Sequence, residues 1–124
     1  MATPTVLIID DDKLTRWSVS RILGRAGYLV REAGSLTEGA TALERQRPDV
    51  ILLDIRLPDG DGFALLKAVR LGHPDLPVIM MTAHASPETE LAALALGARG
   101  HLAKPCNPTK LRAVVGDVLA RGVS

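Results

Sequence analysis

The chain has 124 residues, and fifteen basic residues against fourteen acidic ones leave a formal charge of +1. This balance provides no overall field that would recruit nucleic acid or an anionic membrane. Only 2% of the residues are aromatic, so the core must be aliphatic, and single-stranded nucleic acid would find no stacking platform.

Short aliphatic runs alternate along the chain with longer segments that have a helical period. This alternation predicts a doubly wound α/β fold, in which helices cover both faces of a five-stranded parallel sheet. The second and fifth runs are less uniformly apolar, so we expect these strands nearer the edges of the sheet. In chain order, the expected strands are Val6–Ile9, Tyr28–Glu32, Val50–Leu53, Val78–Met81 and Gly100–Ala103.

Five helices are expected to follow these strands. The apolar residues of the first helix include Leu14 and Trp17. Ser35 and Glu38 have the spacing of a capping box at the start of the second. In chain order, the expected helices are Leu14–Ala26, a segment between Ser35 and Pro48, Phe63–Leu71, a segment from Pro87 to Gly97, and a last one around Leu111–Leu119.

The length fits a single domain over residues 1–124, either free-standing or cut from a longer protein. The lone cysteine, Cys106, excludes an intramolecular disulfide and fits a reducing compartment. The first residues lack a basic leader, and no apolar run approaches the roughly 18 residues that span a bilayer. We therefore expect a soluble, cytoplasmic protein with no membrane partner.

Polar side chains follow four of the five expected strands. Asp10 and Asp11 follow the first strand and Asp54 the third, while Thr82 and Lys104 follow the fourth and the fifth. Ligands of open parallel sheets bind beyond the carboxyl ends of the strands, so we expect these side chains to meet at one rim. Three carboxylates at one place raise one another's pKa values and require a cation, most simply Mg²⁺.

The set also has a chemical interpretation. An aspartate carboxylate can attack phosphorus and form an acyl phosphate, provided that the charge of the phosphoryl oxygens is neutralised. Mg²⁺ and Lys104 would supply the positive charge, and Thr82 could donate a hydrogen bond to a phosphoryl oxygen.

Four stretches contain these residues: IIDDD ending at Asp12, LLDIRLPDGDG from Leu52 to Gly62, MMTAH ending at His84, and HLAKPC ending at Cys106. Together they resemble the receiver domain of two-component response regulators over essentially the whole chain. The resemblance implies a flavodoxin-like (βα)5 fold with the strand order 2-1-3-4-5. DDDKLTRWSVSRIL and LPVIMMTAH look most like receivers of the nitrogen-regulation type, which precede ATPase domains in transcription activators.

The resemblance implies a role for individual residues. Asp54 would accept a phosphoryl group from a phosphohistidine of a sensor histidine kinase. Asp11 would bind Mg²⁺ directly and Asp10 mainly through water, and the backbone carbonyl of Arg56 would be a further metal ligand. Such a protein is a switch that catalyses only its own phosphorylation and dephosphorylation.

Further roles follow from the same resemblance. Thr82 would be the switch hydroxyl, and Lys104, whose bond to Pro105 is typically cis in the family, would hold a phosphoryl oxygen. The side chains of Arg56 and His84 would flank the path of the hydrolytic water, so their bulk should lengthen the life of the acyl phosphate.

Two positions depart from the family pattern. His101 stands where receivers typically have Tyr or Phe, a ring that turns inward when the threonine moves, and Cys106 replaces a second aromatic residue. The resemblance implies output through the fourth helix, fifth strand and fifth helix to an output domain or partner protein, so both departures concern that coupling. It also allows a phosphorylation-linked homodimer and implies no direct nucleic acid binding by this chain.

Neighbouring polar residues have simpler interpretations. We expect Asp12 to cap the helix that begins near Leu14. Asp59 and Asp61 fit a turn whose glycines adopt positive φ. His73 lies in a loop and is expected to be exposed to solvent.

Two other functions use the same architecture. A Mg²⁺-dependent aspartyl-phosphate phosphohydrolase generally has a second acid where this chain has Arg56, and a cap domain for which the length leaves no room. A flavin-binding module would need a loop rich in Ser, Thr and Gly after the first strand, where this chain has three aspartates. Arg56 and the chain length therefore count against the phosphohydrolase, and the three aspartates count against the flavin module.

Overall fold

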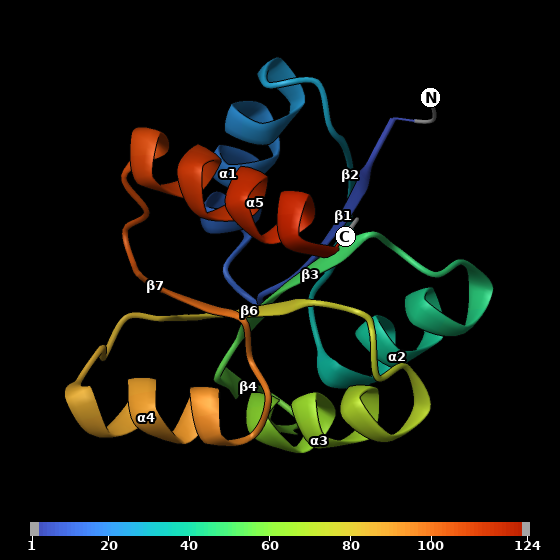
Figure 1. Cartoon of the computed structure of the whole chain (residues 1–124), viewed down its shortest axis with the longest axis vertical. Helices are drawn as coiled ribbons and strands as arrows, with labels where there is room; N and C mark the ends of the chain where they lie inside the picture. The colour runs from blue at the N-terminus through green and yellow to red at the C-terminus, as the bar shows by residue number, and fades with distance from the viewer. Residues whose placement is uncertain (1–2, 123–124) are drawn as a thin grey trace.

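The computed structural model describes residues 3–122 (Figure 1). Its strands are β1 (Thr5–Ile9), β2 (Leu29–Ala33), β3 (Val50–Asp54), β4 (Arg56–Leu57), β5 (Gly60–Asp61), β6 (Val78–Thr82) and β7 (Gly100–Ala103). Five of them form a parallel sheet in the order β2-β1-β3-β6-β7, whereas β4 and β5 pair with each other as an antiparallel hairpin. The parallel sheet has the expected order 2-1-3-4-5, with the second and fifth of its strands at the edges.

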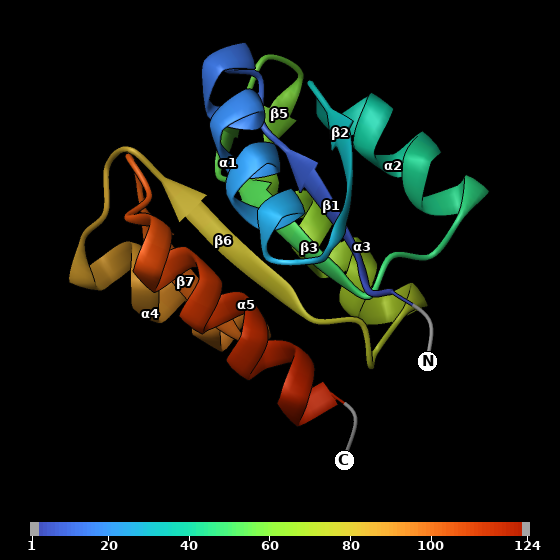
Figure 2. The same ribbon diagram turned by 90° about the horizontal axis from the view of Figure 1, so that it is seen from above.

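Helices cover both faces of this sheet (Figures 1 and 2). One face carries α1 (Lys13–Arg25) and α5 (Pro108–Gly122), and the other carries α2 (Leu36–Arg45), α3 (Gly62–Gly72) and α4 (Pro87–Ala95). Between residues 3 and 122, no helix has the length and apolar character needed to cross a membrane.

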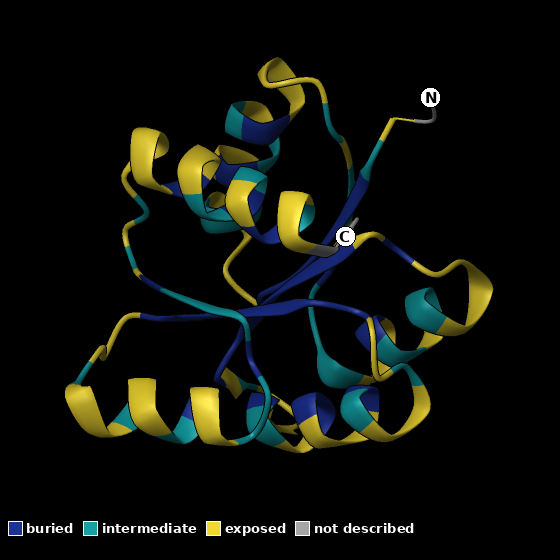
Figure 3. Ribbon diagram, viewed as in Figure 1, coloured by how far each residue is buried: buried dark blue, intermediate teal, exposed yellow. Residues whose placement is uncertain are grey.

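The core is aliphatic and consists of two layers, one on each face of the sheet. Alternate residues of β3 belong to different layers: Ile51 and Leu53 pack with residues of α2, α3 and α4, while Val50 and Leu52 pack with residues of α1 and α5. The three central strands are buried along their whole length (Figure 3). Because these strands are packed on both faces, the positions of the residues at their carboxyl ends are fixed by the core.

The start of α1 differs from the expected helix. Leu14 and Trp17 are 70% and 57% exposed, and α1 buries Val19 and Leu23 instead. Leu14 and Trp17 share a stripe with Arg21, which lies on the opposite side of a helix from the stripe of Val19 and Leu23. The guanidinium of Arg21 stacks on the Trp17 ring, 4.9 Å from its centroid. The protein thus presents two large apolar side chains to solvent beside the carboxyl end of β1.

Other local expectations are corrected as well. Ser35 caps α2 as expected, with its Oγ accepting from the Glu38 N–H. The expected capping box is incomplete, because the Glu38 carboxylate accepts from the N–H of Gly34 rather than of Ser35. The helix also ends at Arg45, before Pro48. His73 is half-buried rather than exposed, and its backbone N–H donates to the carbonyl of Val69 at the end of α3.

The segment expected to be a simple turn forms the β4–β5 hairpin. Gly60 has the expected positive φ of 149°. Gly62 does not, and it is required for a different reason: a Cβ there would lie 2.2 Å from the carbonyl oxygen of Asp54. Asp61 then begins α3 by accepting from the N–H of Phe63 at 2.8 Å. The hairpin is therefore packed directly against the end of β3.

Candidate functional site

Three carboxylates meet at the carboxyl ends of β1 and β3. Asp10 follows β1 and is fully buried, and Asp54, the last residue of β3, is 6% exposed. Asp11 lies in the loop before α1 and is exposed. One carboxylate oxygen from each residue lies within 4.8 Å of the other two. The structure thus brings together the aspartates that the sequence places after separate strands.

The ammonium group of Lys104 lies between two of these carboxylates. Lys104 follows β7, and its peptide bond to Pro105 is cis. Its Nζ is 2.6 Å from Asp10 Oδ2 and 2.9 Å from Asp54 Oδ2. Its backbone N–H donates to the carbonyl of Thr82, which anchors the residue to the end of β6. The protein itself therefore supplies part of the positive charge that the aspartates require.

In this ion pair, burial and the neighbouring charge shift the pKa of each group in opposite directions. Burial raises the pKa of Asp10 by more than its contact with Lys104 lowers it. Burial also lowers the pKa of Lys104, but its contacts with Asp10 and Asp54 outweigh that effect and raise this pKa above the ordinary value. Lys104 is consequently a cation at neutral pH, while burial works against ionisation of Asp10.

The three carboxylates also fit a divalent cation. Carboxylate oxygens are the hard ligands that Mg²⁺ prefers, and Asp11 is exposed, so water can complete the coordination of an ion held there. Asp10 Oδ2 is in ion-pair contact with Lys104 yet accepts no well-directed hydrogen bond, so it retains the capacity to face a second cation.

Residues 6–116 match the family model of the response regulator receiver domain. The chain belongs to this family. The receiver domain is 43% identical over 113 residues to the DNA-binding transcriptional regulator NtrC of Klebsiella pneumoniae, covering 91% of this chain and 24% of that protein. The acidic group of Asp10, Asp11 and Asp54 thus belongs to a receiver domain that resembles part of a transcriptional regulator.

Solved structures resemble this receiver domain along nearly its whole length. A CheY-like receiver domain protein of Methanospirillum hungatei JF-1 has a TM-score of 0.92 at 33% identity, covering 98% of this chain and 97% of that one. NtrX from Brucella abortus in complex with ADP has a TM-score of 0.92 at 31% identity, covering 98% of this chain but 28% of that one. The chain therefore spans about a quarter of the length of the NtrC and NtrX proteins it matches.

Three other expected positions of the receiver domain lie around Asp54. Thr82 ends β6 and is 3% exposed, and its Oγ accepts from the N–H of His84 at 3.0 Å. The N–H of Arg56 donates to Asp54 Oδ1 at 3.4 Å. The side chains of Arg56 and His84 are both exposed. The backbone of Arg56 thus contacts the Asp54 carboxylate and the backbone of His84 contacts Thr82, while both side chains extend into solvent.

Asp12 does not belong to the acidic group, as expected. It is the N-cap of α1, and its carboxylate accepts from the N–H of Leu14 at 3.2 Å and from the hydroxyl of Thr15 at 2.6 Å. The hydroxyl of Thr15 and the N–H of Leu14 lower the pKa of Asp12. The run of three aspartates thus divides into a pair that lies close to Asp54 and a helix cap.

The two departures from the family pattern lie on β7 and directly after it. His101 is half-buried, and its Nε2 is buried without a hydrogen-bond partner among residues 3–122. It lines a hollow of about 500 Å³ against α5, together with Val114 and Val118. Cys106 is also half-buried, with its Sγ 4.0 Å from the sulfur of Met81, and burial raises the pKa of its thiol.

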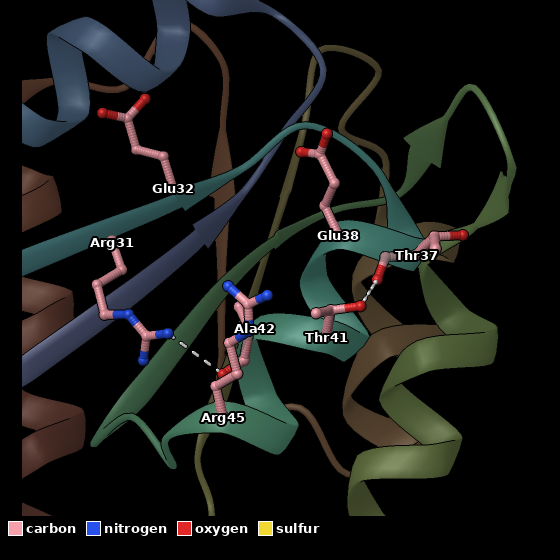
Figure 4. A pocket seen from close by; sticks show the side chains of 7 residues that line it. All are labelled: Arg31, Glu32, Thr37, Glu38, Thr41, Ala42 and Arg45. Atoms are coloured by element: carbon pink, nitrogen blue, oxygen red, sulfur yellow. Dashed lines mark hydrogen bonds between the residues drawn. The ribbon is translucent and has the colours of Figure 1, made fainter.

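A separate hollow of about 430 Å³ lies between β2 and α2 (Figure 4). Its guanidinium groups come from Arg31 and Arg45, and its carboxylates from Glu32 and Glu38. Arg31 is already engaged, since it donates to carbonyls near the end of α2, including that of Ala42. None of these lining residues belongs to the acidic group at Asp54.

Two residues near the site make contacts that had no local signal in the sequence. Arg16 of α1 donates to the carbonyl of Asp10 at 2.6 Å and pairs with Glu32 of β2 at 3.2 Å, so it fixes the loop that carries Asp11. Asp59 binds the beginning of α2, more than twenty residues earlier in the chain. Both contacts join segments that are distant in sequence, which a pattern within one helix or turn does not reveal.

Proposed function

We propose that this receiver domain is a phosphorylation switch in which Asp54 accepts a phosphoryl group from a sensor histidine kinase. The observation that carries the proposal is the environment of Asp54. Its carboxylate is nearly buried, 2.9 Å from the ammonium of Lys104, and shares a potential Mg²⁺ site with Asp10 and Asp11. This arrangement places a nucleophilic oxygen beside positive charge.

The chemistry follows from these positions. An oxygen of Asp54 attacks phosphorus, the P–N bond to the kinase histidine breaks, and the imidazole leaves with the electron pair of that bond. Mg²⁺, when bound by Asp10, Asp11 and the carbonyl of Arg56, would neutralise charge on the phosphoryl oxygens. Lys104 would hold one of these oxygens through a charge-assisted hydrogen bond.

The hydroxyl of Thr82 can bond to the phosphoryl group once Asp54 is phosphorylated. Its Oγ already accepts from the N–H of His84, so its own proton is available to donate to a phosphoryl oxygen on Asp54. Movement of Thr82 toward that oxygen would pull the loop before α4. We propose that the face of α4, β7 and α5 is thereby changed for an output domain or partner, and that exposed Arg56 and His84 slow hydrolysis by restricting water.

The regulators that this chain resembles suggest its wider context. Since NtrC is a DNA-binding transcriptional regulator, we propose that residues 1–124 form one domain of a cytoplasmic regulator of transcription. Binding of DNA would then belong to another part of that regulator, and phosphorylation could act by changing self-association of this domain.

The proposal predicts a chemical shift response that requires Asp54. Beryllofluoride with Mg²⁺ mimics the aspartyl phosphate and should shift the backbone amide resonances of Thr82 and Lys104, because both lie at the rim. Asp54→Ala should show no such shifts. A wild-type protein that does not respond, or a variant that responds equally, would exclude Asp54 as the acceptor.

We expect the kinase to bind at the exposed first turns of α1. Leu14 and Trp17 protrude beside the acidic site, and Lys13–Arg25 contains four basic residues and no acidic one. We expect Trp17→Ala to slow transfer from the kinase about tenfold or more, as loss of an interface hot spot does. Labelling by acetyl phosphate should stay unchanged, because Trp17 takes no part in the chemistry.

A control on the opposite helix layer separates docking from a general effect. Leu71 of α3 is 87% exposed, and Leu71→Ala should transfer at the wild-type rate. Equal loss in Trp17→Ala with kinase and with acetyl phosphate would contradict a docking role.

A further inference from the structure

The tip of the β4–β5 hairpin is bonded to the beginning of α2. The carboxylate of Asp59 accepts from the N–H of Leu36 at 2.8 Å, from the N–H of Thr37 at 3.0 Å and from the hydroxyl of Thr37 at 2.8 Å. Leu36 also packs against the hairpin, since a Cβ on Gly60 would lie 2.9 Å from its Cδ1. One carboxylate and one apolar contact thus join two segments that are far apart in sequence.

The other end of the same hairpin touches the phosphoacceptor. The N–H of Arg56 donates to Asp54 Oδ1, and Arg56 pairs with Asp61 across the hairpin. Gly62 sits against the carbonyl oxygen of Asp54, and its N–H donates to Ile55 at 2.6 Å. A displacement of the hairpin therefore moves the peptide of Arg56 relative to the Asp54 carboxylate.

Capping alone does not account for Asp59, because α2 already has a cap. Ser35 satisfies the N–H of Glu38, and the carbonyl of Ser35 accepts from Gly39. Asp59 takes the two remaining N–H groups at the start of the helix, those of Leu36 and Thr37, from outside the local sequence. Thr37 lies on the first turn of α2 in Figure 4, which places this junction at the edge of the hollow between β2 and α2.

The bonds to Asp59 are those of an ionised carboxylate. The N–H groups of Thr37 and Leu36 lower the pKa of Asp59, so it carries its charge throughout the neutral range. A two-residue strand pair is weak by itself, and an isolated hairpin of this size has little stability of its own. The hairpin therefore depends on its contacts at both ends for a fixed position.

We propose that Asp59 is a positioning residue for the Mg²⁺ site: by binding the beginning of α2 it holds the hairpin so that the Arg56 peptide stays against Asp54. The inference rests on the proposed function, since it takes the carbonyl of Arg56 as a metal ligand. Asp59 itself touches neither the ion nor the phosphoryl group.

Mg²⁺ affinity measured by titration calorimetry tests this role without any phosphoryl transfer. Asp59→Ala removes all three hydrogen bonds, and we expect it to weaken Mg²⁺ binding about tenfold, the lower range for partners that orient metal ligands. Asp59→Asn keeps an oxygen that can accept from the helix and should recover most of the affinity.

Ser35→Ala is the matched control. It removes the other cap of the same helix and leaves the hairpin bonds intact, so it should loosen the start of α2 without changing Mg²⁺ affinity. Amide hydrogen exchange at Leu53 and Ile79, both in central strands, would confirm that each variant is folded.

The outcomes separate this inference from the proposed function. Wild-type affinity in a folded Asp59→Ala, or an equal loss in Ser35→Ala, would overturn the positioning role and leave phosphorylation of Asp54 standing. A wild-type chain that binds no Mg²⁺ would overturn the proposed metal site and this inference together.

Discussion

Replacing Lys104 by Met should slow phosphorylation of Asp54 about 100- to 1000-fold, the effect of removing one preorganised donor from a developing charge. The ammonium lies 2.9 Å from Asp54 Oδ2 and is the cation that this chain itself brings to the carboxylate. Rates with saturating acetyl phosphate and Mg²⁺ measure the effect. Met keeps the length and apolar character of the stem, so the comparison isolates the charge.

The same substitution should alter stability and its dependence on pH. Removing the ammonium leaves Asp10 buried without its counter-ion, so we expect the free energy of unfolding at pH 7 to fall by about 1–3 kcal/mol. Because contacts with Asp10 and Asp54 raise the pKa of Lys104 above 10.5, the wild-type pair stabilises the fold below that pH and is lost as pH rises further. The variant should lack this alkaline loss.

Lys67→Met provides the control, since Lys67 is an exposed lysine on α3. Its phosphorylation rate and stability curve should match those of wild type. A Lys104→Met rate within threefold of wild type would contradict the role given to the ammonium, as would an unchanged alkaline transition.

Replacing Asp11 by Asn should weaken Mg²⁺ binding by at least about 100-fold, because even residues that only orient metal ligands contribute about 10–100-fold. Asp12→Asn is the matched change one residue later, and the amide retains the ability to cap α1. It should leave Mg²⁺ affinity near that of wild type. Calorimetric titration of both variants at one pH measures the difference.

An equal effect of the two changes would mean that the loop acts through its total charge rather than through a defined ligand. The contacts argue against this, because Asp12 is occupied by Leu14 and Thr15 while Asp11 faces the carboxylates of Asp10 and Asp54.

Much of this architecture could be predicted because its signals are local. The uniformly apolar runs ending at Ile9, Leu53 and Met81 predict central strands, and a parallel sheet brings their carboxyl ends together. The convergence of Asp10 and Asp54 then follows from topology alone. Gly27 with φ 99° and Ser86 before Pro87 mark helix ends in the same local way.

What the sequence did not reveal depends on contacts between distant segments. The period of α1 includes Leu14 and Trp17 as readily as Val19, and only packing against the sheet decides which stripe is buried. Asp59 looks like a turn residue because its partners on α2 lie more than twenty positions away. The need for Gly62 arises from the backbone of Asp54 rather than from its own φ.

The most direct test of the central claim is to locate the phosphoryl group after incubation with acetyl phosphate and Mg²⁺. Borohydride reduction converts an aspartyl phosphate to homoserine, and peptide mass spectrometry then identifies the modified position. We expect homoserine at position 54 in wild-type protein and none when Mg²⁺ is chelated. Homoserine at position 10 or 11 instead, or none anywhere, would contradict the assignment of Asp54 as the phosphoacceptor.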